Sequence, residues 1–148
     1  MNTRDLFRHL AKRCQNQLLG IFPADKLPRL LPNSRPLLLV CNTDPHHKPG
    51  QHWITIYLDT QKGGEFFDSF GRSPSPVFRD FMDKHCIRWT YNAIQLQSVI
   101  SSFCGHYCVF YCLFKLLHYS MDSIVKCFTT DTSLNDLIVH KFVCENLT

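Results

Sequence analysis

The segment SSFCGHYCVFYC, residues 101 to 112, places three of the chain's 8 cysteines four residues apart. Cys104 stands where an extended polar stretch meets an apolar run of helical period. A helix N-terminus favours an anion, which lowers the pKa of a thiol and raises its reactive thiolate fraction. Cys108 and Cys112 follow on one face of the same helix, where small apolar residues usually pack. The spacing assigns packing to these two and leaves two roles open for Cys104, nucleophile or core residue.

A thiolate nucleophile needs a general base, and the base needs a group that orients it. His52 directly precedes the alternating stretch WITIYLD, and Asp68 closes EFFD sixteen residues later. If Gly63 and Gly64 form a hairpin turn, the two strands bring His52 and Asp68 side by side. Alone, His52 would be read as a surface histidine and Asp68 as a turn former. Their pairing favours a catalytic dyad.

Acyl transfer also requires hydrogen-bond donors aimed at the developing oxyanion. A nucleophile at a helix N-terminus offers its own backbone N–H, here that of Cys104. Gln97, seven residues earlier, is a candidate for the second donor, and a polar residue at a strand edge is the alternative. Gly105 leaves room beside the nucleophile for a substrate backbone.

The hydrophobic pattern predicts an α+β domain, in which helices pack on an antiparallel sheet. A first helix begins at Asn2 or Thr3 and closes at Gly20, and a proline-rich crossing follows. The expected strands are 37–41, 53–59 and 65–68, with one or two more within 87–97. The later helices are expected at 76–85, 103–118, 121–128 and 133–146.

Length and composition favour one globular domain, residues 1–148. With 45% hydrophobic and 13% aromatic residues, the chain can bury a sizeable core. Lys and Arg exceed Asp and Glu by 16 to 12, which indicates a solvated basic face rather than a dedicated nucleic-acid surface.

The cysteines are expected to be thiols rather than disulfides or zinc ligands. The first residues carry charges and no continuous apolar stretch, so we expect no signal peptide and a reducing compartment. No C-x-x-C pair is present, and three cysteines spread over two helical turns with His106 cannot close a tetrahedral site alone. The uncharged segment 89–114 suits a buried helix better than a membrane span. We therefore expect no metal and no membrane association.

Three segments, GQHWITIYLD, EFFDSFG and LQSVISSFCGHYCVFYC, together resemble the adenovirus-type (adenain-like) cysteine proteases, relatives of the SUMO-deconjugating proteases. That family has His-Trp, then an acidic residue before a Phe-Gly turn, then Gln, then Cys-Gly seven residues later. The matching residues are His52, Trp53, Asp68, Gln97, Cys104 and Gly105. LLGIFPADKLP and LLLVCNT extend the resemblance over residues 5 to 120.

The resemblance implies an adenain-like fold, with a central, mostly antiparallel sheet packed by helices and the nucleophile at the N-terminus of a buried helix. It implies a triad of Cys104 as nucleophile, His52 as general base and Asp68 as its orienter. Gln97 and the Cys104 N–H would form the oxyanion hole. The wall of the site would be built by Trp53 and Gly105, although Trp53 also suits a core position.

Two features differ from the adenovirus enzymes. The acidic residue is Asp68 where they carry Glu, as in the SUMO-type relatives. The chain is also shorter, which leaves open the family's two activators, a capsid-derived peptide and DNA. Cys86 matches the cysteine that forms a disulfide with that peptide, and an ordinary half-buried thiol is the alternative. The chemistry itself requires no cofactor.

These inferences predict a cysteine endopeptidase that cleaves capsid or core precursor proteins of a virus or DNA transposon at glycine-containing sites. We expect a monomer in the host nucleus or cytoplasm, and in the virion. One alternative is a deconjugating protease for ubiquitin-like tails that end in Gly-Gly. Others are a thiol-rich metal-binding protein and a catalytically silent peptide-binding relative, and the intact set of four site residues argues against the silent relative.

Overall fold

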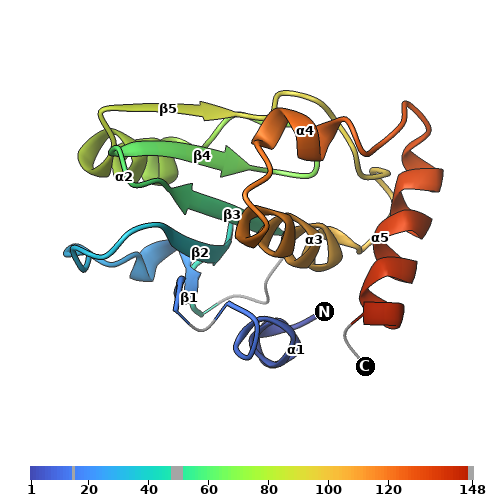
Figure 1. The fold of residues 1–148 in the computed structure, drawn as a ribbon, viewed down its shortest axis with the longest axis horizontal. Helices are drawn as coiled ribbons and strands as arrows, with labels where there is room; N and C mark the ends of the chain where they lie inside the picture. The colour runs from blue at the N-terminus through green and yellow to red at the C-terminus, as the bar shows by residue number, and fades with distance from the viewer. Residues whose placement is uncertain (15, 48–51, 147–148) are drawn as a thin grey trace.

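The computed structural model describes residues 1–14, 16–47 and 52–146, and a five-stranded sheet forms its centre (Figure 1). The strands, in sequence and in spatial order, are β1 Leu18–Pro23, β2 Leu37–Asn42, β3 Trp53–Leu58, β4 Gly63–Phe67 and β5 Arg88–Tyr91. β2, β3 and β4 are antiparallel, whereas β1 and β5 run parallel to their neighbours. The predicted α+β class is confirmed, and the sheet is mixed, with its antiparallel part at the centre.

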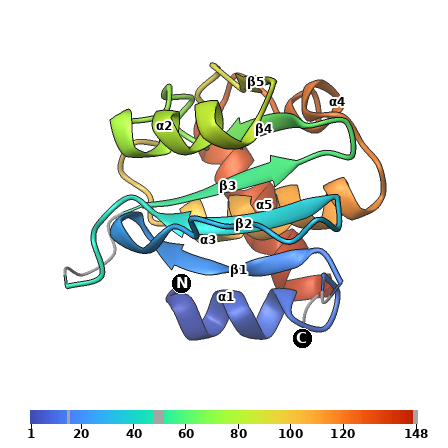
Figure 2. The same ribbon diagram turned by 90° about the vertical axis from the view of Figure 1, so that its left-hand side faces the viewer.

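Helices cover both faces of this sheet (Figure 2). They are α1 Thr3–Leu10, the 3-10 helix η1 Ala24–Lys26, α2 Pro76–His85, α3 Cys104–Leu116, α4 Met121–Val125 and α5 Thr132–Asn146. β2 shows why both faces are filled: Leu38 and Val40 pack toward α3, while Leu37, Leu39 and Cys41 pack toward α2. Because successive side chains of a strand alternate between faces, this uninterrupted apolar run requires a layer on each side.

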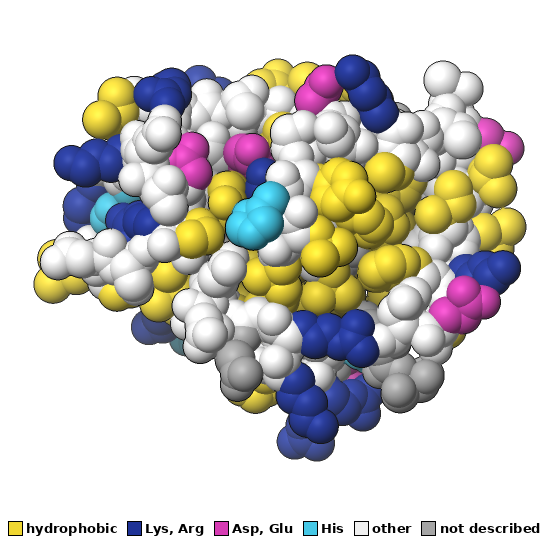
Figure 3. Space-filling model, in the orientation of Figure 1, with side chains coloured by type: hydrophobic (Ala, Val, Ile, Leu, Met, Phe, Trp, Pro, Cys, Tyr) yellow, Lys and Arg dark blue, Asp and Glu magenta, His cyan; other side chains and the backbone are white. Residues whose placement is uncertain are grey.

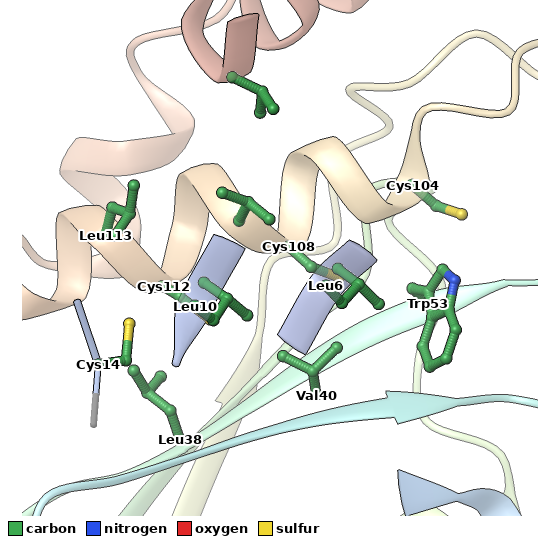
Figure 4. Packing of buried hydrophobic residues seen from close by; sticks show 12 residues of the cluster. Leu6, Leu10, Cys14, Leu38, Val40, Trp53, Cys104, Cys108, Cys112 and Leu113 are labelled. Carbon is green, nitrogen blue, oxygen red and sulfur yellow. The ribbon is translucent and has the colours of Figure 1, made fainter. Parts of the chain in front are cut away.

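α3 is the central helix of one layer, and ten of its thirteen residues are buried. Cys108 and Cys112 face Leu6 and Leu10 of α1, as Figure 4 shows, and are 1% and 0% exposed. Burial raises the pKa of both thiols well above the ordinary value. Their predicted role in packing is confirmed.

The first helix is shorter than predicted. α1 begins with a capping box, in which Asn2 accepts from the Asp5 N–H, and it ends at Leu10 rather than near Gly20. The segment Leu18–Pro23 instead forms β1 in parallel with β2. Leu18 lies at helical spacing from Leu10 and Cys14 by chance, and in the structure it begins a strand. β1 lies at the edge of the sheet, where a proline at the end of a strand is tolerated.

The β3–β4 hairpin also turns earlier than predicted. The turn lies at residues 59–62, where Lys62 has φ 61°, and Gly63 and Gly64 belong to β4. The Asp59 carboxylate accepts from the Gly63 N–H at 2.8 Å and so closes the turn. A Cβ on Gly64 would lie 2.5 Å from Cys86 Sγ, which explains a glycine inside a strand.

The remaining elements follow the predictions closely, and the segment 87–97 supplies one strand, β5. Among the described residues, no helix has the length and apolar character needed to cross a membrane. Hydrophobic side chains are exposed over α3, between α4 and α5 (Figure 3). Leu117, the residue after α3, is 65% exposed and borders a cavity of about 320 Å³ that Phe114 and Phe142 also line.

Candidate active site

His52 and Asp68 meet at the open end of the β3–β4 hairpin. β3 begins at Trp53 and β4 ends at Phe67, so both side chains leave the sheet at the same edge. His52 Nε2 lies 2.6 Å from Asp68 Oδ1, and the two residues are 7% and 4% exposed. The predicted proximity of His52 and Asp68 is confirmed, but the predicted turn would not produce it. A turn at Gly63 and Gly64 would set Asp68 opposite Asp59, whereas the observed register, with Leu58 opposite Gly64, sets it opposite Ile54, two residues from His52.

The Asp68 carboxylate and backbone are both held in place. Oδ1 also accepts from the Phe70 N–H at 2.8 Å, and the Phe70 ring stacks on the His52 imidazole with centroids 4.6 Å apart. Asn92 pairs with the Asp68 backbone: its Oδ1 accepts from the Asp68 N–H at 3.0 Å and its Nδ2 donates to the Asp68 carbonyl at 2.7 Å. The acid that orients His52 is therefore fixed at three points.

Cys104 is the first residue of α3, is 8% exposed and lies beside His52. Burial alone would raise the pKa of Cys104, but its interaction with the neighbouring His52, together with the Trp53 backbone, lowers it. Burial alone would lower the pKa of His52, whereas Asp68 and Cys104 raise it to about 9. These opposite shifts favour a thiolate next to an imidazolium.

The ring nitrogen that serves Cys104 follows from the other contact. Because Nε2 of His52 faces Asp68, Nδ1 is the nitrogen left for the thiol. Nδ1 is buried and, within the part of the chain that the structure describes, has no partner of hydrogen-bonding geometry. The order Asp68, His52, Cys104 is thus the order needed for proton transfer.

Gln97 lies in the segment between β5 and α3 and is 1% exposed. Its Nε2 donates to the backbone oxygen and the Oγ of Ser101, both at 3.1 Å, and its Oε1 accepts from Ser69 Oγ at 2.6 Å. The amide shares a cavity of about 210 Å³ with the His52 imidazole and the Cys104 thiol. The residues that line this cavity are Met1, His52, Trp53, Phe70, Gln97, Ser101, Ser102 and Cys104.

Trp53 lines the cavity, and Met1 lies against both Trp53 and Gly105. Trp53 is 8% exposed, lies near Cys104 (Figure 4), and donates from Nε1 to the Met1 carbonyl at 3.1 Å. A Cβ on Gly105 would lie 2.9 Å from Met1 Cβ and 3.1 Å from its Sδ. The Met1 side chain therefore occupies the space beside Gly105 that was expected to accept a substrate backbone.

Cys86 lies apart from these residues. It directly follows α2, on the face of the sheet opposite α3, and burial raises its pKa to about 11. All 8 cysteines are free thiols. The disulfide to an activating peptide through Cys86, and the DNA partner, stay predictions.

One group of three side chains among the described residues has the spacing of metal ligands. The ligand atoms of Asp25, His46 and His47 lie within 4.8 Å of one another, and all three residues are exposed. The Asp25 carboxylate already accepts from the His46 backbone at 2.7 Å and from its ring at 2.5 Å. The group contains no cysteine, so the zinc alternative for the cysteines of α3 has no support among the described residues.

Three contributors to the site were not identified from the sequence. Ser69 follows the predicted site residue Asp68 in the motif DSFG, and this adjacency is the local signal that could have identified it. Asn92 follows β5 without any periodic pattern. Met1 reaches the cavity only because α1 packs on α3.

The fold is similar to those of solved proteases. One structure of the ASFV pS273R protease has a TM-score of 0.66 and 19% identity over 94% of this chain and 66% of that chain. A second has a TM-score of 0.53 and 25% identity over 72% of this chain, which spans 44% of that chain. ChlaDub1 from Chlamydia trachomatis has a TM-score of 0.51 and 16% identity over 74% of this chain and 58% of that chain.

The similarity also extends across a whole separate domain. The central domain of the uncharacterized Lpg1148 protein from Legionella pneumophila matches 99% of this chain and 95% of its own, with a TM-score of 0.58 and 13% identity. No protein-family model and no curated protein matches the sequence. The predicted fold is confirmed in its class: the chain adopts the fold of the ASFV pS273R protease and of ChlaDub1.

Proposed function

We propose that the chain is a cysteine protease with Cys104 as its nucleophile, His52 as general base and acid, and Asp68 as the residue that orients His52. One observation carries the proposal. The thiol with a lowered pKa and the imidazole with a raised pKa lie together at the wall of one cavity, and Asp68 lies 2.6 Å behind the imidazole. Perturbed groups that converge in a cavity are typical of catalytic sites.

The chemistry proceeds by acyl transfer. The Cys104 thiolate attacks the carbonyl carbon of a peptide bond, and the carbonyl oxygen becomes an oxyanion that accepts from the Cys104 N–H and from Gln97 Nε2. The His52 imidazolium gives its proton to the leaving amine as the C–N bond breaks, which leaves a thioester on Cys104. His52 then takes a proton from water as the hydroxide adds to the thioester, and the C–S bond breaks to release the carboxylic acid and restore the Cys104 thiolate beside the His52 imidazolium.

We propose that the substrates are capsid or core precursor proteins that carry glycine near the cleaved bond. Support comes from the small volume of the cavity and from the close approach of Met1 and Trp53 to the nucleophile, which favour a residue without a side chain. The similarity of the fold to the ASFV pS273R protease supports a viral substrate. The similarity to ChlaDub1 supports the second candidate, a deconjugating protease for Gly-Gly tails.

The proposal is tested with an electrophilic peptide probe that ends in Gly-Gly and carries a vinyl sulfone. We expect the probe to label Cys104, as mapped by mass spectrometry, and His52→Ala to lose the label. Lys126→Ala, which changes an exposed residue away from the site, is the matched control. Labelling of several cysteines to the same extent, or of none, would contradict the proposal.

A second arm separates the substrate classes. Peptides that span a glycine-containing junction are compared with a ubiquitin-like protein fused through its Gly-Gly tail to a reporter. Cleavage of the peptides supports the endopeptidase, whereas release of the reporter alone supports deconjugation. Activity that persists with a metal chelator supports the thiol mechanism, and activity that requires metal would overturn it.

A further inference from the structure

Ser69 makes a buried hydrogen bond to the amide of Gln97. Both residues are 1% exposed, and Ser69 Oγ donates to Gln97 Oε1 at 2.6 Å. Ser69 adjoins Asp68, so the residue that contacts the amide is bonded directly to the residue that orients His52. The acyl-transfer steps proposed above do not involve this serine.

The contacts at the two ends of the Gln97 amide fix which end is which. The Ser101 backbone oxygen, 3.1 Å away, can only accept, so it must face the NH₂ group. The carbonyl end then faces Ser69, whose hydroxyl donates to it. Without that donor, the buried Oε1 would lose its partner, and the amide would be held at one end alone.

The backbone of Ser69 reinforces this arrangement. Its carbonyl accepts from the Gln97 N–H at 3.0 Å and from the Leu96 N–H at 2.8 Å. The main chain and the side chain of Gln97 are therefore both anchored on Ser69. Since Asp68 is held by Asn92 from the same segment, the turn after β4 joins the two halves of the site.

We propose that Ser69 is a positioning residue for the oxyanion hole, which aims Gln97 Nε2 at the carbonyl under attack. The inference rests on the proposed function. Ser69 touches neither the thiol nor the substrate, and it acts through the orientation of Gln97. The amide gives up one contact with Ser101 as the oxyanion forms, while its other end stays on Ser69.

Ser69→Ala should therefore lower kcat without removing the nucleophile or its base. Because removal of an oxyanion donor reduces kcat by about 10²- to 10³-fold, loss of its orientation alone should reduce kcat by roughly 10-fold or more. KM should change little, since the contact matters most in the transition state. Ser69→Thr keeps the hydroxyl and should restore most of the activity.

Two reagents separate positioning from general damage to the site. A peptide aldehyde adds Cys104 to a carbonyl and forms an oxyanion, so its affinity should fall in Ser69→Ala in parallel with kcat. Iodoacetamide alkylates Cys104 by displacing iodide and forms no oxyanion, so its rate should be unchanged. In a Gln97→Ala background, Ser69→Ala should have no further effect on kcat.

Wild-type activity is measured first, and without it the proposed function fails. If the wild type cleaves peptide, equal kcat and equal aldehyde affinity in Ser69→Ala would overturn the inference. A parallel loss of iodoacetamide reactivity would overturn it too, because the serine would then support the whole site. Should Ser69→Ala unfold, Ser69→Cys provides a weaker donor of similar size, and full activity of that folded variant together with full aldehyde affinity would count against the proposal.

Discussion

Asp68 Oδ1 accepts from two donors at once, His52 Nε2 at 2.6 Å and the Phe70 N–H at 2.8 Å. The second bond closes a turn within the chain, so the carboxylate takes its direction from its own backbone. The aspartate side chain reaches the imidazole because Asp68 directly follows the last residue of β4, Phe67.

The pH dependence of alkylation tests the ion pair. Iodoacetamide reacts with thiolate, and the pKa of Cys104 is lowered because its interactions with His52 outweigh burial. The wild-type rate at Cys104 should therefore reach half its maximum below the pH expected of an ordinary thiol. In His52→Ala, only the backbone contacts of Trp53 and Gly105 still oppose burial, so the pKa of Cys104 should rise and the rate at pH 7 should fall by about 10²-fold. Mass spectrometry follows Cys104 itself.

The control for this experiment is Cys104→Ser, which reports the alkylation rate of the exposed thiols, Cys127 and Cys144.

His52 sets the upper limit of the pH range in which peptide is cleaved. Its pKa of about 9 means that the imidazolium is retained at pH 7 and is lost as the pH rises through 9, so peptide cleavage should decline above that pH. An alkylation profile at Cys104 that His52→Ala leaves unchanged would contradict the ion pair.

The positions of His52 and Asp68 at strand ends could be predicted from the sequence, because alternating residues identify β3 and an apolar run identifies β4. Their register could not. A turn at Gly63 and Gly64 would set Asp68 seven residues along β3 from His52, and the turn at residues 59–62 reduces this offset to two. Cys104 was placed by the change from a polar stretch to an apolar helix.

Other features could not be predicted because they depend on distant parts of the chain. β1 forms through pairing with β2, and nothing local separates its apolar residues from those of a helix. The contacts of Asn92 and Ser69 depend on how residues 92–103 fold back over the end of β4, and irregular segments have no periodic pattern. The position of Met1 depends on the docking of α1.

Asn92→Ala tests the support of Asp68 and should differ from Ser69→Ala. It removes both hydrogen bonds to the Asp68 backbone and leaves a buried N–H without a partner, so the free energy of unfolding should fall by about 2 kcal/mol. His52 then loses a fixed partner, and Cys104 alkylation at pH 7 should slow. Urea unfolding and alkylation measure the two effects. A stable variant with wild-type alkylation would assign Asn92 no supporting role.

Gly105→Ala tests whether the space beside Cys104 serves the substrate. The new Cβ would lie 2.9 Å from Met1 Cβ, so Met1 must shift with its backbone, and the gain of about 1 kcal/mol of helix propensity of alanine over glycine offsets that cost. Stability should therefore change little. If the substrate backbone lies over Gly105, the added methyl group should displace it, and KM should rise by roughly 10-fold because the substrate loses contacts with the site. Steady-state kinetics and the Tm separate the two effects, and an unchanged KM would place the substrate elsewhere.

Lys115 tests how much a buried ion pair between α3 and the sheet contributes to stability. It is 6% exposed, and its Nζ lies 3.0 Å from Glu65 Oε1 and 4.3 Å from the centre of the Tyr57 ring. Lys115→Ala leaves the Glu65 carboxylate, whose side chain is 20% exposed, without its cation, so the free energy of unfolding should fall by about 3 kcal/mol.

The matched control for this stability test is Lys126→Ala. Lys126 pairs with Asp122 on the surface, where both side chains are more than 70% exposed, so its removal should change stability little. Glu65→Ala should destabilise the protein too, and the double variant with Lys115→Ala should lose less than the sum of the two, because the groups interact directly. Urea unfolding measures each step. Equal effects of Lys115→Ala and Lys126→Ala would show that the buried pair contributes no more than a surface pair, and that α3 is held on the sheet by apolar packing alone.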